Sequence, residues 1–179
     1  MLWLLETEGG IGRYRLAKML GEPDGIVRGM LSRLRGKGLL VVRPRTGTQA
    51  SRKGLRELAT FMRRNRLRLA KRFDQEILGL GPENVIFQIS GCSGRIGQGV
   101  EQRDAAIKAG ARGAVTILYD GKMLNFPGVT EPISRRSRTA FGHLKRELKL
   151  RRGDAVLISF GDTWWDAARG GFAAIKTLK

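Results

Sequence analysis

Cysteine and histidine are almost missing from this chain, which has one of each in 179 residues, Cys92 and His143. A lone cysteine excludes a disulfide bond within the chain, and two such side chains are too few for a His/Cys zinc site. We therefore expect neither a metal centre nor a bound cofactor. We interpret Cys92 as a buried or incidental thiol and His143 as a surface side chain rather than a general base.

Long apolar runs are also missing. No stretch approaches the ~20 consecutive apolar residues that span a bilayer, and no signal-peptide pattern opens the chain. The hydrophobic content of 41% is nevertheless enough for globular cores. The sequence predicts a soluble cytoplasmic protein without a membrane partner, and its length favours two small domains.

Acidic residues are scarce in comparison with basic ones. Sixteen Asp and Glu side chains stand against 34 Lys and Arg, which gives a formal net charge of +18. Residues 1–74 carry 18 basic and 6 acidic side chains, and residues 75–179 carry 16 and 10. This balance favours a polyanionic partner that is contacted mainly by the first part of the chain.

Two short helical patterns lie between residues 14 and 40. Leu16 and Leu20 mark one face of the first, and the turn at residues 21–24 separates it from the second. The second pattern has a core-facing side formed by Val27, Met30, Leu31 and Leu34. Its other side is polar and basic, so the pair indicates a helix-turn-helix.

A hairpin and another helix are expected next. The Gly-Lys-Gly of residues 36–38 ends the helical pattern, residues 39–43 suit a short buried strand, and residues 48–50 can return after a turn at 44–47. Ser51 is placed to cap the following helix. At the other end, residues 1–8 indicate only part of a helix, so either this helix is short or the native chain starts upstream.

Residues 1–64 resemble winged helix-turn-helix transcriptional regulators. The resemblance is carried most specifically by Gly-Lys-Gly-Leu-Leu at 36–40, followed by a strand, a turn and the Ser-x-x-Gly of 51–54. It implies binding of double-stranded DNA, with the recognition helix in the major groove and the hairpin on the backbone or minor groove. Winged helices also serve as protein adaptors, which remains an alternative. The candidate DNA-binding residues are Arg28, Gly29, Ser32, Arg33, Arg35, Lys37, Arg43, Arg45, Arg52 and Lys53.

A dense basic run at residues 63–73 has two open interpretations: it prolongs the preceding helix as a linker or dimerisation helix, or it is a solvated charged face, which is the more ordinary explanation. We therefore expect a linker or connecting helix at 65–82 and a second domain at 83–179. The elements expected in the second domain are strand 84–90, helix 100–109, strands 114–119 and 123–126, helix 139–150, strand 154–160, and a helix over 164–178 interrupted by Gly170-Gly171. The predicted fold class is α+β, a winged helix-turn-helix followed by a small α/β sandwich.

A glycine-rich loop at residues 90–99 precedes the expected helix of the second domain. Its glycines allow a close backbone approach, and a helix start favours an anion. The loop lacks the Gly-Lys-Ser/Thr of phosphate-binding loops, so a ligand cradle and a plain turn both remain open. One of two adjacent tryptophans is expected in the core, and Arg103 is expected to pair with Asp104. The candidate ligand-binding residues are Gly97, Gly99, Glu101, Arg103, Asp104, Trp164 and Trp165.

The segment from Gly99 to Ala114, together with Pro127-Gly128, is similar to the C-terminal domain of a small family of archaeal winged-helix regulators of unassigned ligand. The similarity implies a second domain that binds a small-molecule effector or holds an oligomer together. We expect a homodimeric, non-enzymatic DNA-binding regulator.

An enzyme is the alternative, namely a bifunctional winged-helix regulator that also modifies a nucleotide or cofactor. Some archaeal proteins fuse a winged helix to a vitamin kinase. Asp154, Asp162 and Asp166 could form a metal site, although the first suits a turn and the second a helix cap.

A cluster of arginines at 135, 136 and 138 has three open interpretations. It suits a DNA face, an anionic effector site or a solvated loop.

Overall fold

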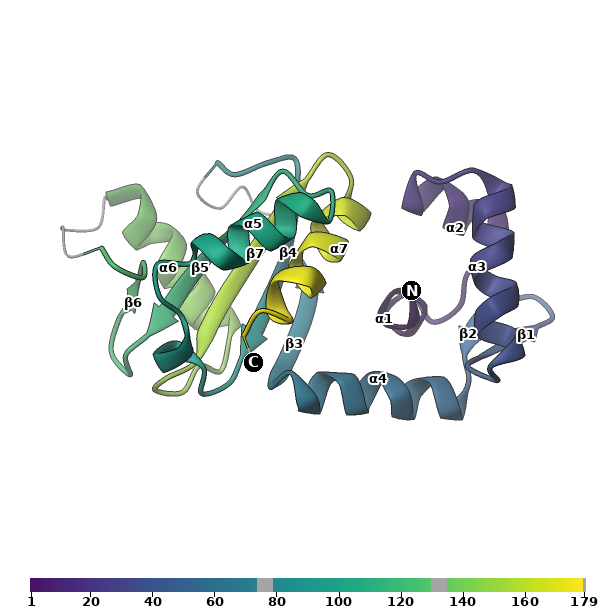
Figure 1. Ribbon diagram of the computed structural model, residues 1–179, viewed down its shortest axis with the longest axis horizontal. Helices are drawn as coiled ribbons and strands as arrows, with labels where there is room; N and C mark the ends of the chain where they lie inside the picture. The colour runs from purple at the N-terminus through teal and green to yellow at the C-terminus, as the bar shows by residue number, and fades with distance from the viewer. Residues whose placement is uncertain (74–78, 130–134, 179) are drawn as a thin grey trace. The chain divides into compact units, whose positions relative to one another are not determined.

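The computed structural model describes residues 1–73, 79–129 and 135–178, which belong to two compact units, Met1–Arg64 and Asn65–Lys179 (Figure 1). Helices accompany two antiparallel sheets, so the fold class is α+β, as predicted. No helix among the described residues is both long and apolar enough to cross a membrane. The first unit ends at Arg64, the residue at which the sequence placed its end.

The first unit has the order helix, helix, helix, hairpin, helix. Its elements are α1 (Leu2–Thr7), α2 (Arg13–Leu20), α3 (Asp24–Gly36), β1 (Leu40–Arg43), β2 (Gly47–Ala50) and α4 (Arg52–Arg64). Strands β1 and β2 pair antiparallel, and Ile11 forms a bridge with Thr48. Gly47 has a φ of 80°, and a Cβ there would meet the Ile11 carbonyl oxygen at 2.5 Å, so glycine permits this close approach.

Local sequence explains how these helices begin and end. Helix α2 ends where Gly21 adopts the left-handed conformation and its N–H donates to Ala17 and Lys18. The predicted cap of α4 is confirmed, because the Ser51 hydroxyl accepts the Gly54 N–H at 3.0 Å. The core of the unit contains Leu4, Leu5, Ile11, Leu16, Leu20, Val27 and Leu40.

The prediction of a buried strand at residues 39–43 is wrong for most of its length. Only Leu40 of β1 is buried, whereas Val41 and Val42 are 38% and 59% exposed. The buried residues of the hairpin are Leu40, at its base, and Thr48, which pairs with Val42 near the turn and forms the bridge with Ile11. Its apolar residues are consequently available on the surface.

The second unit is built on a five-stranded sheet in which every pairing is antiparallel. Its elements are β3 (Leu67–Arg72), β4 (Glu83–Ile89), the short 3₁₀ helix η1 (Ser93–Arg95), α5 (Val100–Lys108), β5 (Gly113–Tyr119), β6 (Leu124–Asn125), α6 (Arg135–Glu147), β7 (Ala155–Gly161) and α7 (Trp164–Ile175). The strand order is β3-β4-β7-β5-β6. Strand β7 therefore lies between β4 and β5, which are joined through α5.

Alternating residues of the central strands supply both faces of this sheet. Ile86 of β4 belongs to the cluster that contains Phe141 and Leu144 of α6. Phe87, the next residue, makes an edge-to-face contact with Phe172 of α7, with ring centroids 5.1 Å apart. Helices α5 and α7 pack together (Figure 1) and cover the face opposite α6.

The linker predicted at residues 65–82 is largely wrong. Leu67–Arg72 forms the edge strand β3, in which Ala70 pairs with Phe87 and Lys71 with Ile86. Backbone pairing with β4 and the burial of Leu67 outweigh the helical spacing of the basic run. Residues 74–78 of the predicted linker lie outside the described residues.

The expected interruption of the last helix is also wrong. Helix α7 continues through Gly170 and Gly171, and a Cβ at the latter would overlap the ring of Phe87. The two glycines bring the helix close to the sheet rather than break it. At the start of this helix the cap is Thr163 and not Asp162, because the Thr163 hydroxyl accepts the Asp166 N–H at 3.1 Å.

Candidate nucleic-acid interface

Helix α3 presents a polar and basic surface. Val27 is fully buried against the rest of the unit, which fixes the orientation of the helix. On the far side, Arg28, Ser32, Arg33 and Arg35 are exposed, and Gly29 lies between them. None of these three arginines has an acidic partner within 4 Å in the described part of the chain. Their guanidinium groups are therefore free to contact an anionic partner.

A groove of about 530 Å³ runs along this surface. Helix α3 contributes Arg28, Ser32 and Arg35 to it, and the hairpin contributes Val42. The start of α2 closes the groove with Tyr14, whose side chain is 75% exposed. The groove therefore combines cations with an exposed aromatic ring and an exposed valine, side chains suited to phosphates, base edges and methyl groups.

Arg13 has a different role from the arginines of α3. Its Nε lies 2.7 Å from a carboxylate oxygen of Asp24, at the start of α3, and its guanidinium carbon lies 4.9 Å from the centre of the Tyr14 ring. This ion pair connects the first turns of α2 and α3. Arg13 therefore positions Tyr14 and the start of the exposed helix.

The hairpin divides the remaining candidate residues between two faces. Val42 faces the groove of α3, whereas Val41 and Arg43 line a second depression of about 410 Å³ together with Arg52. Because successive residues of a strand face opposite sides, Arg43 cannot share the surface of Val42. The structure thus separates Arg43 and Arg52 from the arginines of α3, although the sequence grouped them.

The turn of the hairpin carries Arg45 at its tip. Arg45 is exposed and has a φ of 71°, which is uncommon for a residue with a side chain. Lys37 and Lys53 lie at the C-terminal end of α3, where the Lys53 ammonium donates to the Lys37 carbonyl oxygen at 2.9 Å. They add cations at the end of the exposed helix that leads into the hairpin.

The candidate ligand residues of the second unit do not come together. Gly97, Gly99 and Glu101 lie around the start of α5, in the chain that follows the Ile89 end of β4. Trp164 and Trp165 follow Gly161, which pairs with Glu83 at the other end of that strand. The candidates around the start of α5 therefore lie toward one end of the sheet, and the two tryptophans lie at the other end.

Individual members of this set have ordinary structural roles. Arg103 pairs with Asp104 at 3.1 Å, as expected. Trp164 is 7% exposed and belongs to the core, while Trp165 is half-buried. Gly99 caps α5 in the left-handed conformation, and the space beside Gly97 is open.

Asp154 is a buried carboxylate that organises the end of the sheet next to the glycine-rich loop. Its oxygens accept hydrogen bonds from Gln88 Nε2 at 3.1 Å and from the backbone N–H groups of Arg151 and Gly91 at 2.9 and 3.3 Å. Asp162 pairs instead with Arg112 at 3.0 Å. No group of three or more His, Cys, Asp or Glu side chains among the described residues is arranged to hold a metal ion.

The two units together define an α+β protein whose first unit carries a basic helix and hairpin surface. The chain belongs to the family described as a domain of unknown function, DUF4443, which residues 80–178 match. Its structure is similar to that of hypothetical protein PH0730 from Pyrococcus horikoshii OT3, with a TM-score of 0.72 and 19% sequence identity. The alignment covers 94% of this chain and 84% of that one. No curated protein matches the chain.

The sequence interpretation missed Tyr14 and Val42 as members of the candidate interface. Tyr14 opens α2 next to the apolar positions of that helix, and Val42 belongs to an apolar pair that indicated a buried strand. Both residues line the groove of α3 because the start of α2 and the hairpin, about 28 residues apart in the chain, both lie beside that helix. No local pattern in the sequence signals that arrangement.

Proposed function

We propose that this protein is a transcription regulator that binds double-stranded DNA through a winged helix-turn-helix in its first unit. The observation that carries the proposal is the exposed face of α3, on which Arg28, Arg33 and Arg35 have no acidic partner among the described residues. A helix of this kind fits the major groove, and arginine forms two hydrogen bonds to the edge of a guanine.

The rest of the first unit supports the same assignment. The order of its elements is that of a winged helix, and the hairpin carries Arg45 at its tip. The unit contains 14 Lys and Arg against 5 Asp and Glu. Such an excess favours attraction to phosphates, and the tip arginine can contact the DNA backbone while α3 contacts base edges.

We further propose that the second unit binds a small-molecule effector or holds two copies of the chain together. A homodimer would then present two copies of α3 to two half-sites of an operator. The matching of residues 80–178 to one family supports a role for this unit that is independent of the DNA-binding surface.

Selection of binding sites from a pool of randomised duplexes with the full-length protein tests the proposal. We expect a defined motif, and an affinity for it at least ~10³-fold higher than for a scrambled duplex at physiological salt. Equal affinity for selected and scrambled duplexes would rule out sequence-specific regulation. A matched variant, Arg52→Ala, removes a cation of α4 that lines the depression on the other side of the hairpin, and it should keep the motif.

A further inference from the structure

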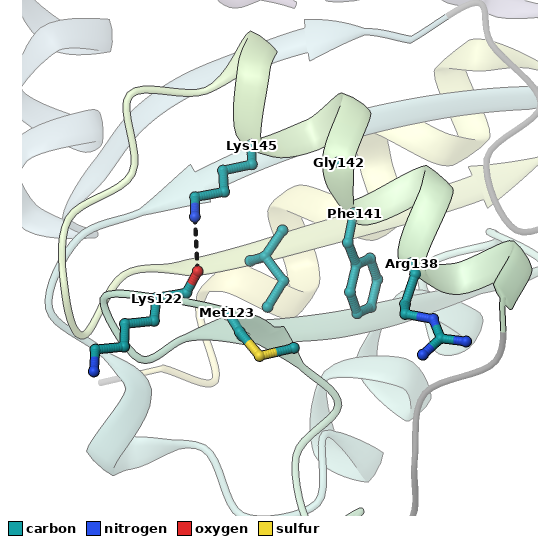
Figure 2. A pocket seen from close by; sticks show the side chains of 7 residues that line it. Lys122, Met123, Arg138, Phe141, Gly142 and Lys145 are labelled. Atoms are coloured by element: carbon teal, nitrogen blue, oxygen red, sulfur yellow. Dashed lines mark hydrogen bonds between the residues drawn. The ribbon is translucent and has the colours of Figure 1, made fainter.

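The second unit contains a small depression between α6 and the turn that joins β5 to β6 (Figure 2). Its volume is about 150 Å³. Helix α6 contributes Arg138, Phe141, Gly142 and Lys145, which recur at the three- and four-residue spacing of one helix face. The turn and β6 contribute Lys122, Met123 and Leu124.

The floor of this depression is apolar and fixed by the core. Phe141 is 6% exposed and packs edge to face on Phe126, with ring centroids 5.2 Å apart. Leu124 is 3% exposed, whereas Met123 is 55% exposed at the mouth. A cavity of about this volume with an apolar lining accommodates a benzene ring. The space is thus matched to one ring or a short branched chain.

The rim is positively charged, and its cations are held differently. The Lys145 ammonium donates to the Lys122 carbonyl oxygen at 2.7 Å and lies 5.6 Å from the centre of the Tyr119 ring. Arg138 is exposed at the other end of the row (Figure 2) and has no acidic partner within 4 Å among the described residues. Lys145 therefore supplies a fixed charge, and Arg138 supplies a guanidinium that is free to bind an anion.

Asp120 is the acidic residue of the adjoining turn, and both of its oxygens accept hydrogen bonds from within the turn and β6. One oxygen accepts the backbone N–H groups of Lys122 and Met123, both at 2.7 Å, and the other accepts Asn125 Nδ2 at 3.3 Å. These backbone hydrogen bonds lower the pKa of the Asp120 carboxyl. Asp120 thus stays ionised within the turn and does not neutralise Arg138.

We infer that this depression binds a small organic acid with an aromatic or branched apolar body, whose carboxylate pairs with Arg138 while its body rests on Phe141 and Leu124. This inference rests on the proposed function, in which the second unit binds an effector, and it supplies the chemical class of that effector. A bare inorganic anion would leave the apolar floor uncovered, and a neutral compound would leave Arg138 without an acidic partner among the described residues.

Gly142 provides a way to close the depression without disturbing the protein. It lies on the exposed side of α6, and an added Cβ would meet no atom within 4 Å. Leucine also has a higher helix propensity than glycine. Gly142→Leu should therefore fold and fill the space, whereas Gly142→Ala should leave most of it open.

The test is a titration of the full-length protein, with ¹³C-labelled methionine methyl groups, followed by NMR at Met123. The probes are phenylacetate, its neutral analogue 2-phenylethanol, acetate, and inorganic phosphate. We expect phenylacetate to shift the Met123 methyl signal saturably, with an affinity at least about tenfold higher than that of the other three, because it alone uses both floor and rim. Equal shifts with acetate, phosphate or 2-phenylethanol would overturn the inference.

Variants locate the binding. Arg138→Gln should lower the affinity for phenylacetate about tenfold, because it removes a charged hydrogen bond. Gly142→Leu should abolish binding. Lys108→Gln, which removes a cation of α5 outside the depression, should bind as the parent does. Unchanged affinity in Arg138→Gln or in folded Gly142→Leu would contradict the site. Phenylacetate binding is measured without DNA, so its failure is distinguishable from a failure of duplex recognition.

Discussion

At the scale of single residues, Gly171 is required by packing rather than by backbone conformation. It lies within α7, where a Cβ would overlap the Phe87 ring. Gly171→Ala should destabilise the fold by about 1–3 kcal/mol, because the strain of overpacking exceeds the gain in helix propensity. Thermal unfolding of Gly142→Ala gives the comparison, since that glycine has open space and its replacement should stabilise by up to about 1 kcal/mol. A higher Tm for Gly171→Ala would show that the helix does not approach the sheet so closely.

Cys92 gives a second prediction at this scale. Its side chain is fully buried, and burial raises the pKa of the thiol to about 11. Because only the thiolate reacts, iodoacetamide should modify the native protein very slowly at pH 8, and faster as the pH rises toward 11. The unfolded chain, in which a free cysteine has a pKa of ~8.5, should react readily. Mass spectrometry is unambiguous because the chain has one cysteine, and equal rates in the two states would disprove the burial.

At the scale of the elements, the sequence predicted the helices of the first unit because their apolar residues repeat regularly and their ends are marked. Val27 and Ser51 illustrate this, because Val27 is the buried residue in the first turn of α3 and Ser51 is the cap of α4. The same spacing correctly placed Arg28 and Arg33 on the exposed side of α3. What it could not predict is the neighbourhood of that face, including Tyr14, because this depends on packing between distant segments.

Strand β3 is an element that the sequence could not predict. In the basic run, arginines at 66 and 68 alternate with leucines at 67 and 69, which is typical of a strand, but the same apolar residues also fit a helix. The segment becomes a strand because its backbone pairs with the edge of β4, where Leu67 lies opposite Ile89. Such long-range pairing is absent from any local pattern.

The hairpin provides a prediction at the element scale. Arg45 at its tip should contact the phosphate backbone and not bases. Arg45→Ala should therefore lower the affinity for selected and scrambled duplexes by the same factor. Fluorescence anisotropy with both duplexes measures this. A loss confined to the selected duplex would show that Arg45 reads sequence, for example in the minor groove.

At the scale of the whole molecule, the net charge of +18 predicts a strong salt dependence of DNA binding. Cations that neutralise phosphates release counterions, so six contacts would cost about 10³-fold in affinity between 50 and 200 mM salt. Anisotropy titrations of the full-length protein at several salt concentrations give the slope. A binding constant that does not change with salt would contradict a phosphate-contacting surface.

The proposed homodimer adds a geometric expectation. Two copies of α3 should favour an operator with two inverted half-sites about 10–10.5 base pairs apart, or a multiple of this spacing. The motif obtained by selection reports the spacing directly. A single unrepeated half-site, bound by one copy of the chain, would contradict the dimer while leaving recognition by α3 intact.

The central claim is that α3 recognises sequence, and the most direct measurement is the ratio of affinities for the selected and scrambled duplexes in matched arginine variants. Arg28→Ala should lower this ratio by the equivalent of about 1–3 kcal/mol if Arg28 pairs with a guanine, because only the selected duplex then loses the contact. Arg52→Ala, at the start of α4 and outside the groove of α3, should leave the ratio unchanged. An unchanged ratio in Arg28→Ala and Arg33→Ala, or a larger loss in Arg52→Ala, would contradict recognition of DNA through α3.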